Sequence, residues 1–267
     1  MSIGDELLRR MHDFMRNYMK SFYTDDDEVQ LGIDVKEKHT GYVTANSVEL
    51  AKQLKLSRHD VALAEIIGLF HDIGRFRQYA VYKTFNDARS EDHAQMGVKY
   101  LAELPFMQEL VKDDYDTVIF AIKNHNKREI EPTDDKRKKM FAEIIRDADK
   151  LDIYRVLEPY LVGGKKGLNF VGANAKEEVS PDFIDDFVAG KQADYYRIRT
   201  EGDRKLVRLM WVYDINFAWT MRKIVERGYI DKIAAALLPM NDKMKTGIEK
   251  LQDYVKDKCE QHDEQNL

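Results

Sequence analysis

The chain has 267 residues, 43% of them hydrophobic, which is enough for a buried core in one large domain or in a domain with an extension. Its 43 Lys and Arg residues against 48 Asp and Glu residues give a net charge of -5, which argues against a long nucleic-acid duplex as partner and leaves a small charged substrate open. The single cysteine, Cys259, excludes an intramolecular disulfide and a Cys-based metal motif, and it fits a reducing cytoplasm.

Residues 1–35 are predicted to form an amphipathic helix followed by an acidic loop. Charged residues interrupt the apolar ones over 7–22, so this stretch is neither a signal peptide nor a membrane span. The acidic run at 25–28 is expected to be a solvated loop. No later stretch is long and apolar enough to cross a bilayer, so no membrane partner is expected.

Two helices are predicted next, over 39–56 and 57–72. The first has one inward face, formed by His39, Val43, Asn46, Leu50 and Leu54. Ser57 is expected to cap the second helix, which is so apolar over 61–70 that it must be buried nearly all round. Its end delivers His71 and Asp72 into the interior before Gly74 stops the helix.

Two further histidines lie at predicted helix ends. Ser90 is expected to cap a helix with His93 in its first turn, where the positive end of the helix dipole disfavours imidazolium. The neutral imidazole that results is the form that binds metal. His125 lies one turn after Ala121, at the end of another apolar face.

Two neighbouring carboxylates, Asp147 and Asp149, compete for the last inward position. Asp149 shares a helical face with the apolar residues at 142, 145, 153 and 156, whereas Asp147 falls on the polar side. Asp149 is therefore the predicted ligand. For Asp152, one turn further on, a role as hydrogen-bond acceptor behind a ligand and a surface or capping role are both open.

The helical pattern loosens after residue 161 and resumes after Pro181. The Gly/Lys segment 163–167 lacks the spacing of a phosphate-binding P-loop and is predicted to be a flexible connection. The fold class is therefore all-α, with a helical bundle over 36–160 and a helical extension over 161–267 that packs on it. Aromatic residues of the extension, such as Trp211 and Trp219, are expected in its core, although a homodimer interface would also use them.

One ordered series of polar residues carries the chemistry: His39, His71, Asp72, His93, His125 and Asp149. Imidazole and carboxylate ligands without thiolates are typical of a catalytic divalent metal site rather than a structural zinc site. In these contexts the sequence resembles the HD superfamily of metal-dependent phosphohydrolases. The defining pattern of that superfamily is a His, a later His-Asp doublet and a still later Asp, which here are His39, His71-Asp72 and Asp149.

This resemblance implies an HD-domain helical bundle that binds divalent metal. One ion would have four ligands, which are His39, His71, Asp72 and Asp149. His93 and His125 resemble the extra pair of members with two metals, and they would hold a second ion bridged by Asp72. Two ions about 3.5 to 4 Å apart would activate a bridging hydroxide as nucleophile. Manganese, iron, cobalt, nickel and zinc all suit such ligands.

Hydrolysis of a phosphate ester, of a nucleotide or another small phosphorylated metabolite, is the leading functional prediction, with Asp72 at the catalytic centre. Arg75, one turn after His71, is the preferred phosphate contact, and Lys150 directly after the last Asp is a second candidate. Other basic residues between the ligand segments are Arg77, Lys83 and Arg89.

Two other functions compete with hydrolysis. The same six ligands resemble those of HD-fold oxygenases, in which two irons activate dioxygen to oxidise a small organic substrate. The third hypothesis is a ligand-sensing or interaction module, against which the intact ligand series argues. The sequence has no Gly-Tyr-Pro motif of the cyclic-dinucleotide branch and no synthetase segment of the alarmone enzymes, so neither specialised activity is assigned.

Overall fold

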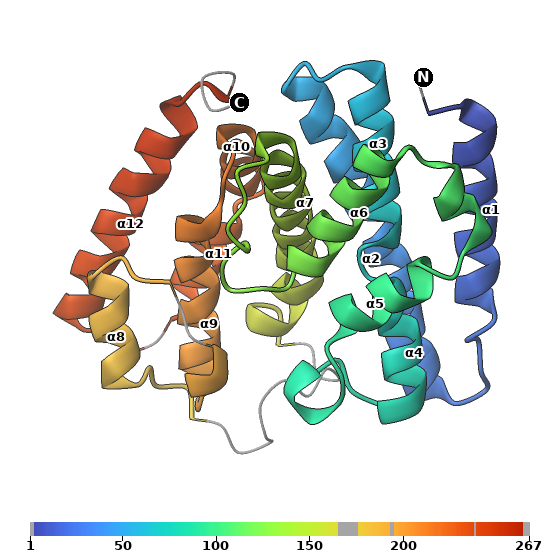
Figure 1. The fold of residues 1–267 in the computed structure, drawn as a ribbon. Helices are drawn as coiled ribbons and strands as arrows, with labels where there is room; N and C mark the ends of the chain where they lie inside the picture. The colour runs from blue at the N-terminus through green and yellow to red at the C-terminus, as the bar shows by residue number, and fades with distance from the viewer. Residues whose placement is uncertain (1–2, 165–175, 193–194, 238, 264–267) are drawn as a thin grey trace. The chain divides into compact units, whose positions relative to one another are not determined.

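The computed structural model describes residues 3–164, 176–192, 195–237 and 239–263. Their secondary structure is helical throughout, without a strand, which confirms the all-α prediction (Figure 1). None of the described helices combines the length and the apolar character needed to span a bilayer. The chain divides into two compact units, of which the first ends at Asp152 and the second begins at Ile153.

The first unit contains the helices that carry the six residues of the predicted series. Its α-helices are α1 (Asp5–Lys20), α2 (Asp27–Gln53), α3 (Arg58–Phe70), α4 (Ile73–Tyr82), α5 (His93–Leu101), α6 (Lys112–Asn124) and the greater part of α7 (Lys136–Leu161). Short 3-10 helices, η1 (Asp87–Arg89) and η2 (Pro105–Glu109), connect some of them. The amphipathic first helix is confirmed as α1, which buries Met11, Met15 and Met19 and packs against α3.

The acidic run at 25–28 is exposed, as predicted, but only Asp25 and Asp26 lie outside a helix, because α2 begins at Asp27. The Asp26 side chain accepts hydrogen bonds from the backbone N–H groups of Glu28 and Val29 and so caps the helix. Asp27 and Glu28 lie in the first turn, where carboxylates interact favourably with the positive end of the helix dipole. As a result α2 starts twelve residues before His39 and holds that histidine in its middle.

Helices α2 and α3 pack against each other (Figure 1), and Gly68 lies at their contact. A Cβ atom on Gly68 would lie 2.8 Å from the Thr44 Cα and 2.9 Å from the Ser47 Oγ. Only a residue without a side chain therefore lets the end of α3 approach the middle of α2. The predicted inward face of α2 is confirmed, since all five of its residues are buried.

We predicted that Gly74 stops the apolar helix, because it follows the His-Asp doublet. This prediction is wrong. The chain turns at His71 and Asp72 and enters α4, with Gly74 in the first turn. A Cβ atom there would collide with the His93 carbonyl oxygen and would lie 2.9 Å from the Gly97 amide nitrogen. Gly74 thus brings the start of α4 against the start of α5, and with it Asp72 close to His93.

The second unit is also all-helical. It contains α8 (Pro181–Val188), η3 (Tyr195–Arg197), α9 (Glu201–Met210), η4 (Trp211–Asp214), α10 (Ala218–Glu226), α11 (Tyr229–Ala235) and α12 (Asp242–Glu260). Helix α12 packs against α8 and α10, and α9 packs against α8 and α11. Trp211 and Trp219 are buried, as predicted for core residues. Of the predicted Gly/Lys connection, residues 165–167 lie outside the described residues.

Candidate metal centre

The six residues of the predicted series come together inside the first unit, although five separate segments supply them. His39 projects from the middle of α2, His71 and Asp72 form the junction of α3 and α4, and His93 is the first residue of α5. His125 caps the end of α6, and Asp149 lies in α7. The four imidazoles are at most 5% exposed, so the cluster is enclosed by these helices.

One half of the cluster contains His39, His71, Asp149 and one oxygen of Asp72. The His39 Nε2 lies 3.0 Å from the Asp149 Oδ1 and 3.4 Å from the His71 Nε2. The Oδ2 of Asp72 lies 3.5 Å from the His39 Nε2 and 3.6 Å from the His71 Nε2. His39, His71 and Asp72 thus present ligand atoms within 4.8 Å of one another, as a metal ion requires.

The other half contains His93, His125 and the second oxygen of Asp72. The Nε2 atoms of the two histidines are 2.9 Å apart. The Asp72 Oδ1 lies 3.3 Å from the His93 Nε2 and 3.6 Å from the His125 Nε2. Asp72 therefore presents one oxygen to each pair of histidines, which is the arrangement of a carboxylate that bridges two ions.

Every Nδ1 atom of the four histidines has a hydrogen-bond acceptor. His39 donates to the Asp152 Oδ2 at 2.7 Å and His93 donates to the Asp87 Oδ2 at 2.8 Å. His71 and His125 donate to backbone carbonyls of their own helices, at Gly68 and Ile122 respectively. These acceptors place the proton of each neutral imidazole on Nδ1 and leave the Nε2 lone pair for a cation.

This donor set fits divalent metal ions. In the neutral tautomers, pairs of Nε2 lone pairs point at each other across 2.9 Å and 3.4 Å, and two carboxylates join them. Like lone pairs repel unless a proton or a cation lies between them, and nitrogen with carboxylate oxygen is a preferred ligand set of zinc, manganese, iron, cobalt and nickel.

The environment keeps two of the imidazoles neutral far below their usual titration range. Burial lowers the pKa of His71 to about 4. Burial, together with the positive charge of Arg75, lowers the pKa of His93 to about 3. His39 differs, because burial and Lys36 oppose protonation but hydrogen bonds to Asp149 and Asp152 outweigh them and raise its pKa.

The carboxylates are held in the ionised form. Burial alone would raise the pKa of Asp72, but Lys36 and the surrounding histidines hold that pKa well below its usual range. Burial likewise opposes ionisation of Asp149, and the hydrogen bond and charge of His39 nevertheless lower its pKa. Both groups are therefore anionic at neutral pH, as metal ligands must be.

The lowered histidine pKa values predict an acid-dependent loss of stability for protein treated with EDTA. An unfolded histidine titrates near 6.5, so between pH 6.5 and about 4 the unfolded chain binds protons that folded His71 does not. The contribution of His71 to the free energy of unfolding should be fully present above pH 6.5 and should fall by about 3 kcal/mol between pH 6.5 and pH 4. His39, with its raised pKa, stabilises below pH 6.5 and loses that contribution as the pH rises.

Urea denaturation at half-unit intervals between pH 4 and pH 7.5 measures this dependence. His71→Asn removes one of the two histidines with a strongly lowered pKa and should make the curve less steep, and His59→Asn, outside the cluster, is the control variant. An equally steep curve for His71→Asn would contradict the assignment.

Lys36 is a site residue that the sequence reasoning missed. Its Nζ lies 2.6 Å from the Asp72 Oδ2, and its side chain is only 15% exposed. Lys36 precedes His39 by three residues, and residues three apart share a helix face. That spacing could have identified Lys36, but the predicted helix began at His39 and therefore excluded it.

Asp87 is the second missed residue, and it joins His93, a candidate metal ligand, to a basic residue. Besides the His93 Nδ1, it accepts hydrogen bonds from the Arg75 Nη1 at 2.8 Å and from the Gln78 Nε2 at 2.8 Å. Asn126 also donates to it, at 3.2 Å. No periodic pattern marks Asp87, because it lies in the short helix η1 between α4 and α5.

The predicted phosphate contacts differ in where they lie. Arg75 is beside the cluster, with its Nε 3.5 Å from the Asp72 Oδ1 and its side chain 15% exposed. Lys150 is buried in α7 directly after Asp149, and consecutive helix residues point in different directions. The remaining basic residues of that region, Arg77, Lys83 and Arg89, are exposed.

Two details of the predicted local structure are wrong. The cap of α5 is Asp92 rather than Ser90, because the Asp92 Oδ1 accepts from the Ala94 and Gln95 amides. Asp147 is fully buried rather than on a polar face, since α7 is enclosed on several sides at this level. Of the two roles considered for Asp152, the structure favours that of hydrogen-bond acceptor: Asp152 is buried and accepts a hydrogen bond from the His39 Nδ1.

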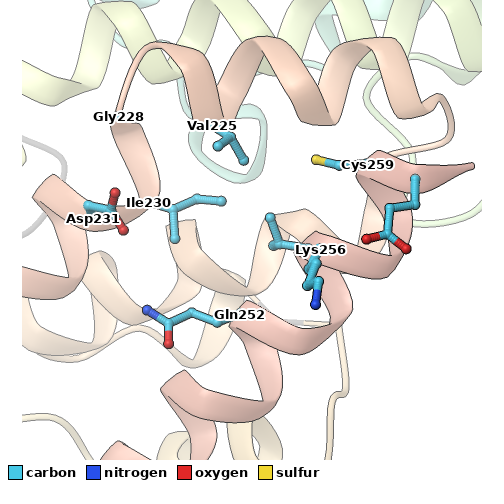
Figure 2. A pocket seen from close by; sticks show the side chains of 9 residues that line it. Val225, Gly228, Ile230, Asp231, Gln252, Lys256 and Cys259 are labelled. Carbon is cyan, nitrogen blue, oxygen red and sulfur yellow. The ribbon is translucent and has the colours of Figure 1, made fainter.

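Two cavities lie apart from this cluster. One, of about 400 Å³ in the second unit, is mostly apolar, and the side chains of Val225, Ile230 and Cys259 border it (Figure 2). The other, of about 490 Å³ in the first unit, is lined mainly by polar residues, among them His59 and Asp114. Neither is lined by a residue of the histidine series.

Comparison with protein families matches part of the chain to a known domain. Residues 37–154 match the family model described as the HD domain, and this segment includes all six residues of the cluster. No curated protein matches the chain, and no solved structure does.

Proposed function

We propose that this protein hydrolyses a phosphate ester of a nucleotide or another small phosphorylated metabolite, because residues 37–154 match the model of the HD domain, the domain of a superfamily of metal-dependent hydrolases. One observation carries the choice of an anionic substrate. Two cationic side chains, Lys36 and Arg75, lie at opposite oxygens of the carboxylate that both histidine pairs share.

The ligand residues divide into two sets that share Asp72. One ion would be held by His39, His71, Asp72 and Asp149, and a second by Asp72, His93 and His125. When bound, two divalent ions supply the Lewis acidity that makes water a nucleophile near neutral pH and that balances charge on the phosphoryl oxygens. Asp152 and Asp87 orient His39 and His93 through their Nδ1 protons.

Lys36 and Arg75 bind the substrate in this proposal. The Lys36 ammonium acts as a point charge toward a phosphoryl oxygen, and the Arg75 guanidinium offers directed N–H donors. Asp87 fixes the Arg75 Nη1, so the guanidinium is held at one orientation before a substrate arrives. Preorganised cations of this kind stabilise the charge that develops on a transferring phosphoryl group.

A phosphatase screen with Lys36→Met tests this proposal. Nucleotides, cyclic nucleotides and sugar phosphates would be assayed with manganese, iron, cobalt, nickel and zinc in turn. Loss of a charge-assisted hydrogen bond worth about 2 kcal/mol should reduce kcat/KM by about 30-fold, while metal content stays the same. Lys36→Arg should restore part of the activity.

Lys38→Met is the matched control, since this exposed lysine lies on the same helix and should be silent. A protein that hydrolyses none of these esters but oxidises an organic substrate with a stable pair of irons would overturn the proposal in favour of an oxygenase. Equal activity of Lys36→Met and Lys38→Met would show that Lys36 does not bind the substrate and would contradict the proposed substrate class.

A further inference from the structure

The second unit contains a buried arginine for which the proposed function has no use. Arg208, in α9, is only 8% exposed. Its Nε and Nη1 are buried without a hydrogen-bond partner, and no ion pair joins it to a carboxylate among the described residues. A buried guanidinium normally has a counter-ion and paired N–H groups, because removing its charge from water is strongly unfavourable.

Two aromatic rings lie against this guanidinium. The Arg208 Cζ lies 4.2 Å from the Trp211 ring centre and 5.4 Å from the Tyr195 ring centre. Contact with π-systems stabilises the cation but gives its N–H groups no oxygen acceptor. The Nε and Nη1 donors therefore remain available to an acceptor.

The surroundings add donors and positive charge but no described counter-ion. The Trp211 Nε1, another N–H donor, is also buried without a partner. The groups that act on Arg208 electrostatically are Tyr195, Tyr154 and the guanidinium of Arg204, which is itself paired with Glu201. The Tyr154 hydroxyl donates to the Arg208 carbonyl oxygen and so holds the backbone of α9 at this position.

We propose that Arg208, with the indole N–H of Trp211, is a binding site for an oxyanion, either a phosphoryl group or a carboxylate of a small ligand. Arginine donors in one plane recognise the oxygens of both groups, and the anion neutralises the buried charge. The site is built from residues of the second unit alone and is separate from the metal ligands.

Trp211 gives this proposal a direct optical test. In a Trp219→Phe background it is the sole tryptophan, and an anion in the guanidinium plane beside its ring should change its fluorescence. The full-length protein would be titrated at constant ionic strength with inorganic phosphate and with acetate, and with chloride as reference. We expect a saturable change with phosphate or acetate and none with chloride, and whichever responds more strongly identifies the oxyanion.

Three variants separate the outcomes. Arg208→Gln should abolish the saturable change, whereas Arg222→Gln, an exposed arginine of the same unit, and Lys36→Met at the proposed active site should both retain it. The result is therefore independent of hydrolysis. No response of the Trp219→Phe parent, with thermal unfolding showing a folded protein, refutes the ligand site.

Discussion

Asp72→Asn is expected to release both metal ions and to lower kcat/KM for the phosphate ester by about 10³-fold or more, equivalent to about 4 kcal/mol of transition-state stabilisation. The carboxylate presents Oδ2 to His39 and His71 and Oδ1 to His93. An amide keeps only one acceptor oxygen and replaces the other by an NH2 donor, which opposes a cation. The same change removes the negative charge that Lys36 contacts.

Metal content per chain, measured by elemental mass spectrometry after reconstitution and desalting, is the primary measurement for this variant. Asp114→Asn is the matched control, because Asp114 is equally buried and is also held by a histidine and an arginine, His59 and Arg137. The control should lose stability but keep its metal. Full metal content in Asp72→Asn would show that this residue is not a ligand.

His125→Gln is expected to release one ion and to keep the other. His125 is the better residue of its pair to substitute, because its Nδ1 bonds only a backbone carbonyl. The Nδ1 of His93 bonds Asp87, which in turn bonds Arg75, so a change at His93 would disturb both. The remaining ligands around His39 are untouched by the change. We expect a decrease in kcat of about 10²-fold or more, because one of two charges that stabilise the transition state is lost.

The stoichiometry distinguishes a site with two ions from a site with one. Parent, His125→Gln and Asp72→Asn should bind two, one and no ions in that order, and His59→Gln should bind as many as the parent. A parent that binds one ion, with His125→Gln unchanged, would leave His93 and His125 as structural residues.

The sequence predicted that these residues point inward because three of the four histidines lie at a place that a local pattern marks. His39 lies on an apolar face, and His71 and His125 end apolar helices, so periodicity alone turns them inward. The all-α class followed from the same periodicity. Burial and capping of α3 by Ser57 are confirmed in the structure.

What the sequence could not predict depends on contacts between distant segments. Asp87 reaches His93 because Arg75 and Gln78 of α4 hold it, and neither bond has a local signature. The position of Asp147 was predicted wrongly because a helical wheel assumes one solvent-exposed face, whereas α7 is buried on several sides around Ala148. The acidic start of α2 was misread because charge runs and helix N-termini have the same composition.

The Nδ1 bonds make the two halves of the cluster alike in one respect that affects how the site can change. Each half has one imidazole oriented by a carboxylate, Asp152 or Asp87, and one oriented by a backbone carbonyl. A backbone carbonyl is unaffected by side-chain substitution, so the hydrogen-bond acceptors of His71 and His125 are fixed while the helices persist. We expect substitutions at Asp152 and Asp87 to change the basicity of His39 and of His93 separately, and with it the affinity of each proposed ion.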